Sequence, residues 1–272
     1  MAEQDSKFSS NPNFILVVLL VIAAFLVGVF WTKSKELEKK VAGTTTVKQQ
    51  AVTGNNAPEP TKAETQVSLA TIKGLFGKNL IKFGDENKKL LLVEVADPSC
   101  PYCQVAAGEN PELNAQVGDR FKLSTDGGTY VAPVKEMRKL IDNGDASFVF
   151  IYQNGHGNGE MAMKSLYCAY DQKKFWEAHD KLMTNEGYNL INNEVKNDKT
   201  QTDKLVSFLG NAVDSGSLKS CLESGKYDSR ITSDAQLAGS LGVSGTPGFF
   251  VNAKNFAGAY SWTDMKSALP QN

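Results

Sequence analysis

Two cysteines separated by two residues are the part of the sequence best suited to chemistry. Cys100 and Cys103 lie in the stretch "DPSCPYCQV", residues 97–105. A pair at this spacing can be a redox dithiol, half of a zinc site or a structural disulfide. Pro101 follows the first cysteine and suits the first turn of a helix, so we predict that a helix begins there.

A helix start would give the two thiols different roles. The unpaired N–H groups and partial positive charge of a helix N-terminus stabilise a thiolate and lower the pKa of the thiol. Cys100 precedes the predicted start, so we expect it to be the exposed nucleophile. Cys103 lies one turn into the helix, so we expect a buried resolving thiol close enough to form a disulfide with Cys100. This Cys100–Cys103 disulfide would be the redox-active group, without a further cofactor and without a metal.

An acidic residue lies six positions before the first cysteine. Glu94 belongs to a stretch that otherwise reads "LLLVEVA". A carboxylate in a buried strand is costly unless it has a partner or a role, and burial raises its pKa. Beneath the dithiol it could accept the proton of Cys103 near neutral pH. Strand alternation could instead point Glu94 to solvent, but the strand is apolar on both faces, so we predict a catalytic role.

A threonine and a proline stand directly before a late strand. They are Thr246 and Pro247, in "GVSGTPGFFVN". An X-Pro bond in this position can be cis, which is uncommon in proteins. In a thiol exchanger, a cis-proline loop opposite the dithiol exposes backbone groups that pair with an extended substrate. We therefore predict that Thr246 and Pro247 bind substrate, together with Pro101 and Tyr102 between the two cysteines.

The elements that must position these residues follow an α/β order. Apolar runs bounded by turn residues predict strands, and apolar residues at helical spacing predict helices. The predicted strands are 79–84, 89–97 and 146–153, followed by a strand pair within 246–260; the predicted helices begin at Pro101 and cover 159–183, 202–213, 233–242 and 261–269. A helical block therefore interrupts an α/β frame.

These motifs resemble the thioredoxin superfamily, and within it the DsbA-like oxidoreductases of bacterial envelopes. The resemblance runs from about Leu80 to the C-terminus. It rests on the segments "VEVADPSCPYC", "KKFWEAHDKLM", "CLESGKYD" and "LGVSGTPGFFVN". It implies a thioredoxin fold with an inserted helical domain, about 156–242, and disulfide transfer to exported cysteine-containing proteins.

By position, the resemblance also implies roles for single residues. Cys100 matches the nucleophile, Cys103 the resolving cysteine, Glu94 the buried acid and Pro247 the cis-proline. The chain departs from many oxidants of this family in having Pro-Tyr rather than Pro-His between the cysteines. Because these two residues tune the redox potential, a reductase or an isomerase on the same fold is the alternative to an oxidase.

A second departure is the length of chain after the dithiol. The segment 109–143 is more than a simple thioredoxin needs. We predict a small hairpin over 120–133 and a helix over 133–144, without assigning the segment a role.

The remaining cysteines, Cys168 and Cys221, lie in separate helical stretches. They could form a structural disulfide, remain free buried thiols, or join Cys100 and Cys103 in a zinc site. Structural zinc usually takes two close ligand pairs, and 53 positions separate these two, which argues against zinc. Since free thiols that can meet do not persist in an oxidising compartment, we favour the disulfide.

The N-terminal part of the chain differs from the rest. Residues 14–31 carry no charge and, as a helix, would span about 27 Å, close to the hydrocarbon core of a bilayer. We predict a short tail over 1–13, an uncleaved transmembrane signal anchor over 14–31, a disordered linker over 32–68 rich in polar residues, and a thioredoxin domain over 69–272.

The two available arguments place the domain on opposite sides of the membrane. Lysines flank the predicted span unevenly: Lys7 precedes it, and Lys33, Lys35, Lys39 and Lys40 follow it. The positive-inside rule alone would put the domain in the cytoplasm. An oxidising dithiol is useful only where disulfides persist, so we predict an extracytoplasmic domain on a single-pass anchor.

The composition limits the possible partners. A net charge of −1, from 29 basic and 30 acidic residues, is not that of a nucleic-acid-binding protein. The expected partners are exported proteins with cysteines and a membrane quinone-linked reoxidant. A binding module in which the two cysteines are only a structural disulfide is the hypothesis from a different class.

Overall fold

The computed structural model describes residues 67–270. The predicted tail 1–13, the predicted transmembrane segment 14–31 and nearly all of the predicted linker 32–68 lie outside these residues. Between 67 and 270, no helix is both long enough and apolar enough to cross a membrane.

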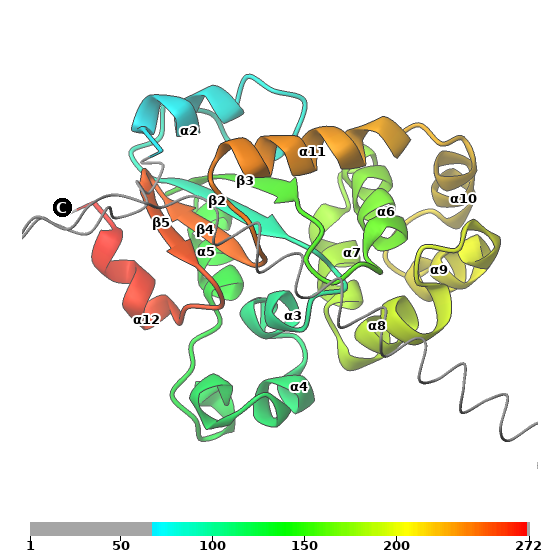
Figure 1. Ribbon diagram of the computed structural model, residues 1–272, viewed down its shortest axis with the longest axis horizontal. Helices are drawn as coiled ribbons and strands as arrows, with labels where there is room; N and C mark the ends of the chain where they lie inside the picture. The colour runs from blue at the N-terminus through cyan, green and yellow to red at the C-terminus, as the bar shows by residue number, and fades with distance from the viewer. Residues whose placement is uncertain (1–66, 271–272) are drawn as a thin grey trace, which may run out of the picture. The chain divides into compact units, whose positions relative to one another are not determined.

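A five-stranded sheet lies at the centre of the fold (Figure 1). Its strands lie in the order β1-β3-β2-β4-β5. β2 and β3 are parallel, and the other neighbours are antiparallel. Every residue of β2 and of β3 is buried, because both strands are interior and both faces of the sheet are covered. The strand bounds are β1 Ile81–Phe83, β2 Leu91–Ala96, β3 Ser147–Tyr152, β4 Gly248–Val251 and β5 Lys254–Ala257.

Alternate side chains of β2 enter two different apolar cores. Val93 and Val95 pack with α2 (Leu69–Leu75) and α11 (Asp228–Ser240). Leu92 and Ala96 share the other core with Cys103. Figure 1 shows α2 and α11 on one side of the sheet, and α3 (Pro101–Ala107) and α5 (Pro133–Asp142) on the other. The alternation therefore places Glu94 on the same face as the helix that carries the dithiol.

The connection between β3 and β4 is helical. A disulfide between Cys168 and Cys221 joins two of its helices, with an S–S length of 2.03 Å and a Cα–Cα distance of 6.0 Å. The elements are α6 Glu160–Asp171, α7 Phe175–Leu182, α8 Asn185–Asn189, the π-helix Leu190–Val195, the 3-10 helix Lys199–Gln201, α9 Thr202–Leu209, α10 Ser215–Glu223 and α11. The predicted insertion, about 156–242, includes α11, which itself packs on the sheet through Ala238.

The helical stretch predicted over 159–183 is two helices. α6 ends at Asp171, Lys173 adopts a left-handed conformation with φ 60°, and α7 begins at Phe175. The turn brings the aromatic face of α7 onto the sheet, where the ring centroids of Trp176 and Phe148 are 5.5 Å apart. The apolar residues of 159–183 keep a helical spacing across the break because both helices bury one face against the same core.

The hairpin predicted over 120–133 was wrong. This segment forms two short 3-10 helices, Asp119–Phe121 and Ser124–Asp126, and one isolated bridge between Leu123 and Tyr130. Phe121, Leu123 and Tyr130 are buried in a small core with Val105 of α3. Side-chain anchoring on α3 and on α4 (Pro111–Gln116) therefore replaces a strand ladder. The helix predicted after it is α5, and the chain ends with β5, α12 (Trp262–Met265) and the 3-10 helix Lys266–Ala268.

Candidate active site

The two cysteines of the dithiol lie at the start of α3. Cys100 is the residue before the helix and Pro101 is its first residue, as predicted. The carbonyl of Cys100 accepts hydrogen bonds from the N–H groups of Cys103 and Gln104, each at 3.1 Å. Both thiols are free and both side chains are buried. The first turn of α3 therefore holds the two sulfurs together beneath the surface.

The prediction that Cys100 is exposed was wrong. Cys100 is only 4% exposed, and Cys103 is completely buried. The Sγ atom of Cys100 lies 3.5 Å from the carbonyl oxygen of Thr246, which belongs to the loop before β4. The loop that contains Thr246 and Pro247 therefore lies opposite the dithiol, as predicted.

The two thiols have opposite pKa shifts. The pKa of Cys100 falls from 9.0 to about 6, chiefly because the Cys103 thiol donates a hydrogen bond to its sulfur. Burial opposes this, while contacts with Thr246 and the N–H groups of Cys103 and Tyr102 lower the pKa further. Burial raises the pKa of Cys103 well above 9.0, and the neighbouring Cys100 and Glu94 add to the effect. One sulfur is thus prepared to be a thiolate and the other to keep its proton.

Glu94 is buried beneath this pair. Its side chain is 0% exposed, and neither carboxylate oxygen has a hydrogen-bond partner within the part of the chain described. Burial raises the pKa of Glu94 to about 7, although the nearby His179 acts to lower it. A carboxyl group with this pKa can both take and give a proton near neutral pH.

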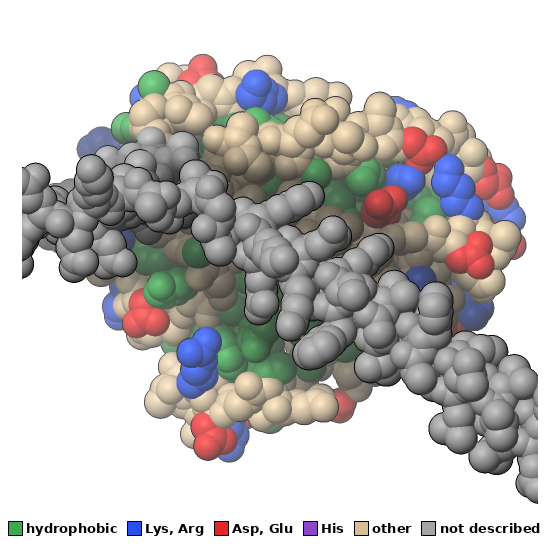
Figure 2. Space-filling model, in the orientation of Figure 1, with side chains coloured by type: hydrophobic (Ala, Val, Ile, Leu, Met, Phe, Trp, Pro, Cys, Tyr) green, Lys and Arg blue, Asp and Glu red, His purple; other side chains and the backbone are tan. Residues whose placement is uncertain are grey.

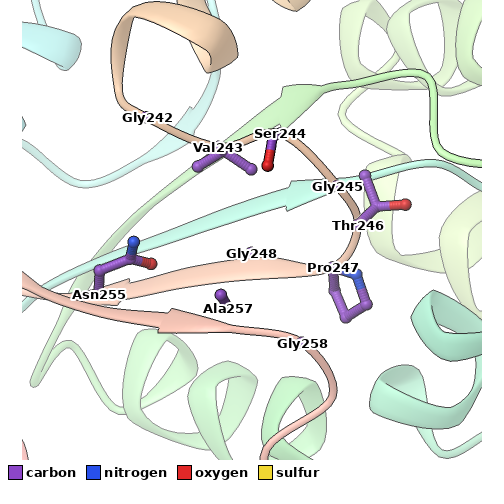
Figure 3. A pocket seen from close by; sticks show the side chains of 10 residues that line it. All are labelled: Gly242, Val243, Ser244, Gly245, Thr246, Pro247, Gly248, Asn255, Ala257 and Gly258. Atoms are coloured by element: carbon purple, nitrogen blue, oxygen red, sulfur yellow. The ribbon is translucent and has the colours of Figure 1, made fainter. Parts of the chain in front are cut away.

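The loop before β4 contains a cis peptide bond between Thr246 and Pro247. Figure 3 shows this loop running from Gly242 to Pro247, directly before β4. A hollow of about 270 Å³ lies against the loop, with Gly258 on its far wall. The carbonyl of Pro247 accepts a hydrogen bond from the N–H of Gly258 at 2.8 Å, which fixes the loop to the end of β5.

Comparison with known protein families identifies the family of this chain. Residues 129–271, just over half of the chain, match the family described as Thioredoxin. The chain belongs to the thioredoxin family. The matched residues include the cis-proline loop and begin after the dithiol, so the match does not itself cover Cys100 and Cys103.

Solved structures of the same fold come from several bacteria. Oxidised BdbD from Bacillus subtilis has a TM-score of 0.50 and 19% identity, over 69% of this chain and 89% of that one. The α-DsbA1 of Wolbachia pipientis has a TM-score of 0.50 and 20% identity, over 70% and 88%. DsbA from Chlamydia trachomatis has a TM-score of 0.50 and 14% identity, over 77% and 94%. At these identities the likeness shows a shared fold.

One curated relative is a different type of protein from these solved structures. The chain is 24% identical over 190 residues to the Na(+)/H(+) antiporter NhaA 3 of Salinispora tropica. The alignment covers 68% of this chain but 24% of the antiporter. This thioredoxin-family protein therefore spans about a quarter of that relative's length.

An aromatic surface borders the dithiol of this thioredoxin-family protein. Tyr102 and Tyr260 are both 44% exposed. The ring of Tyr102 lies 5.6 Å from that of Phe121, between ring centroids. A hollow of about 400 Å³ between Phe121 and Tyr260 continues this surface. In Figure 2, apolar side chains gather above α4 next to α3, whereas charged side chains of both signs cover α9 and α10.

Sequence reasoning missed Asp97, which holds the loops around the dithiol. Its carboxylate accepts hydrogen bonds from the Ser99 N–H and hydroxyl at 2.8 and 2.7 Å. It also accepts from the N–H groups of Gly155 and His156 at 2.8 and 2.9 Å. A Cβ atom on Gly159 would lie 1.8 Å from this carboxylate, so the loop needs glycine there. An aspartate directly after a buried strand, with a glycine-rich loop elsewhere in the chain, was the available signal.

His179 was not among the predicted site residues. Its side chain is 1% exposed and lies in α7, with the ring centroid 6.3 Å from that of Phe150. Phe150 is the β3 residue in register with Glu94. His179 thus faces the same region of the core as the buried carboxyl group.

Proposed function

We propose that this protein is a thiol-disulfide oxidoreductase in which Cys100 and Cys103 form the redox pair. The observation that carries the proposal is the opposite pKa shift of the two thiols at the start of α3. A low pKa makes Cys100 a thiolate at neutral pH, and a thiolate is the nucleophile of thiol exchange. A zinc site is not favoured, because Cys168 and Cys221 are joined to each other.

The exchange would proceed in two balanced steps. In the oxidised protein, a substrate thiolate attacks Cys100, the Cys100–Cys103 bond breaks, and Cys103 leaves as a thiolate that takes a proton from Glu94. A second substrate thiolate then attacks the substrate sulfur of the mixed disulfide, and Cys100 leaves as a stable thiolate. The substrate loses two electrons and the protein gains them. In the reverse direction Glu94 accepts the proton of Cys103.

Substrate would bind along the cis-proline loop. The carbonyl of Thr246 already lies beside the sulfur of Cys100. An extended peptide could align with Thr246 and Pro247 and contact Pro101 and the exposed ring of Tyr102. The hollow shown in Figure 3 would receive a side chain of that peptide.

The oxidase direction is the one we favour. A lowered Cys100 pKa stabilises the reduced dithiol relative to the disulfide, which makes the couple more oxidising. The pKa of Cys100 of about 6 supports this direction over a reductase or an isomerase. No cofactor is needed beyond the Cys100–Cys103 disulfide.

The proposed location is the outer face of the cell membrane. Residues 14–31 would anchor the chain and residues 32–68 would tether the catalytic domain. The Cys168–Cys221 disulfide fits a compartment in which disulfides persist. The substrates would be exported proteins with cysteines, and a quinone-linked membrane protein would reoxidise the dithiol. Protease added to wall-stripped cells should digest the domain; protection of the domain would contradict this location.

The test of the activity is equilibration of the full-length protein with glutathione buffers. We expect a strongly oxidising Cys100–Cys103 couple and oxidation of a reduced, unfolded substrate protein. Cys100→Ala should abolish substrate oxidation, while Cys168→Ala combined with Cys221→Ala should retain it. A strongly reducing potential would favour the reductase, and full function of Cys100→Ala would favour a binding module.

A further inference from the structure

Two titratable side chains are buried in the same core without partners on their functional atoms. Both carboxylate oxygens of Glu94 and the Nε2 atom of His179 lack a hydrogen-bond partner among the described residues. Glu94 is 0% exposed and His179 is 1% exposed. Because unpaired polar groups at such depth are costly, their retention calls for a functional explanation.

The geometry of the sheet brings the two groups to one place. Glu94 of β2 is in register with Phe150 of β3, so both side chains leave the same face of the sheet. The imidazole of His179 lies 6.3 Å from the Phe150 ring, between centroids, and His179 acts to lower the pKa of Glu94. Glu94 in turn acts on Cys103. His179 and Glu94 therefore face the same part of the core, around Phe150 and beneath Cys103.

The other nitrogen of the imidazole leads toward the surface. Nδ1 of His179 lies 3.1 Å from Oδ1 of Asp180, whose side chain is 35% exposed. A carboxylate only accepts, so Nδ1 donates this hydrogen bond, which leaves the lone pair of a neutral ring on Nε2. Partial burial would raise the pKa of Asp180, but contacts with His179 and Arg138 outweigh it and lower that pKa. A positive imidazolium would thus be stabilised by Asp180.

We propose that His179 is a proton relay between the buried Glu94 and the solvent at Asp180. The proposal rests on the dithiol chemistry proposed above and adds a route for its proton. Glu94 has no exit of its own, because it is enclosed by the sheet and by the helices over it. His179 has one nitrogen in the core and the other hydrogen-bonded to a carboxylate at the surface.

The proton balance of the relay follows the direction of exchange. When the dithiol is oxidised, Cys103 gives its proton to Glu94. No hydrogen bond joins Glu94 to Nε2, so one buried water would carry the proton between them, and the Nδ1 proton then leaves beside Asp180. When the disulfide is reduced, a proton enters at Nδ1, Nε2 returns its proton to Glu94 by the same water, and Glu94 protonates the departing Cys103. The two halves of a turnover restore the same tautomer, so nothing else is consumed.

Other titratable or charged groups that face the pair lie on three more elements. Cys103 lies on α3, Arg138 of α5 donates a hydrogen bond to Asp180, and Tyr130 lies in the segment before α5. Burial raises the pKa of Tyr130, with a smaller contribution from Glu94, so it stays protonated over the range tested below. Arg138 keeps its charge throughout. Glu94 is therefore the carboxyl group of this set whose pKa lies near neutral pH.

The test compares His179→Gln with wild type in the full-length oxidised protein. Dithiothreitol reduces the Cys100–Cys103 disulfide, and the rate constant per dithiothreitol thiolate is followed from pH 5 to 9. Glutamine keeps a polar side chain of similar length but cannot relay a proton. We expect His179→Gln to slow the reaction about tenfold, with a changed pH profile, as expected when one proton-transfer group is lost. The alkylation rate of reduced Cys100 should stay unchanged.

Controls on the same helix separate the relay from a structural effect. Glu177→Gln changes an exposed carboxylate of α7 and should leave the rate and its pH profile as in wild type. Asp180→Asn keeps the imidazole but removes the anion beside it, so it should slow the reaction in the same direction. If circular dichroism shows that His179→Gln does not fold, the rate measured for Asp180→Asn is used instead: a wild-type rate and pH profile would overturn the relay.

The apparent pKa of Glu94, from carbon-13 NMR of its carboxyl group, provides a second measurement. It should rise in His179→Gln, because His179 acts to lower it. A rate profile that superimposes on wild type, or an unchanged Glu94 pKa, overturns the relay. If instead wild type does not exchange disulfides at all, the proposed function fails, which is a different outcome.

Discussion

Replacing Glu94 by glutamine should make the stability of the fold less dependent on pH. The carboxyl group of Glu94 has its pKa raised from 4.5 to about 7 by complete burial. Below pH 4.5 the group is neutral in both the folded and the unfolded chain, so it costs nothing. Between these values the unfolded chain ionises first, so unfolding becomes easier as the pH rises. Above pH 7 the full cost is present, roughly 3 kcal/mol for a shift of this size.

The assay is urea unfolding of reduced wild type and Glu94→Gln at several pH values from 4 to 8.5. The free energy of unfolding of Glu94→Gln minus that of wild type should grow with pH by roughly 3 kcal/mol. Glu86→Gln, which changes an exposed carboxylate before β2, is the matched control and should show no such trend. If the difference in free energy of unfolding stays constant across this pH range, the pKa of Glu94 is not raised by burial. Glu94 would then not be suited to proton transfer near neutral pH.

Three further results are expected. The rate of alkylation of Cys100 by iodoacetamide should rise with pH around pH 6 and then become constant, while Cys103 stays unreactive. The rate should be low at every pH because the Cys100 sulfur is buried. An inflection of the rate near pH 9 would refute the lowered pKa. Glu94→Gln should slow reduction of the disulfide by dithiothreitol about a hundredfold at neutral pH, as measured by stopped flow, and an unchanged rate would exclude proton transfer by Glu94. Cys168→Ala combined with Cys221→Ala should lower the free energy of unfolding by about 4 kcal/mol, from the 53-residue separation that the disulfide closes; no change in urea unfolding would contradict this.

Local sequence was enough to predict the start of α3 and the apolar strands. Pro101 after Cys100 marks a helix start, and continuous apolar runs mark strands that are buried on both faces. The burial of Glu94 followed from the same run, since a strand that is covered on both faces has no solvent side for a carboxylate. The sequence favoured a disulfide between Cys168 and Cys221 but could not establish it, because spacing along the chain does not give the distance between two helices.

Local sequence was not enough where distant segments meet. The hairpin expected over 120–133 is absent because Phe121 and Tyr130 gain more by packing against α3 than by pairing in a ladder. The helix expected over 159–183 is broken at Lys173 because the second half must turn to cover the sheet. In both cases burial against other elements outweighed the local pattern.

The chemistry divides in the same way. The sequence by itself determined which atoms can react: two thiols one helical turn apart, and an acid in the strand that leads to them. Only the tertiary structure decided the individual contacts that set their reactivity. It brings the Thr246 carbonyl against the Cys100 sulfur and His179 against the region of Glu94, from loops and helices more than eighty residues away. The reactivity of a thiol or a carboxyl depends on burial and on neighbouring charges, and these arise from packing between segments that no local pattern records.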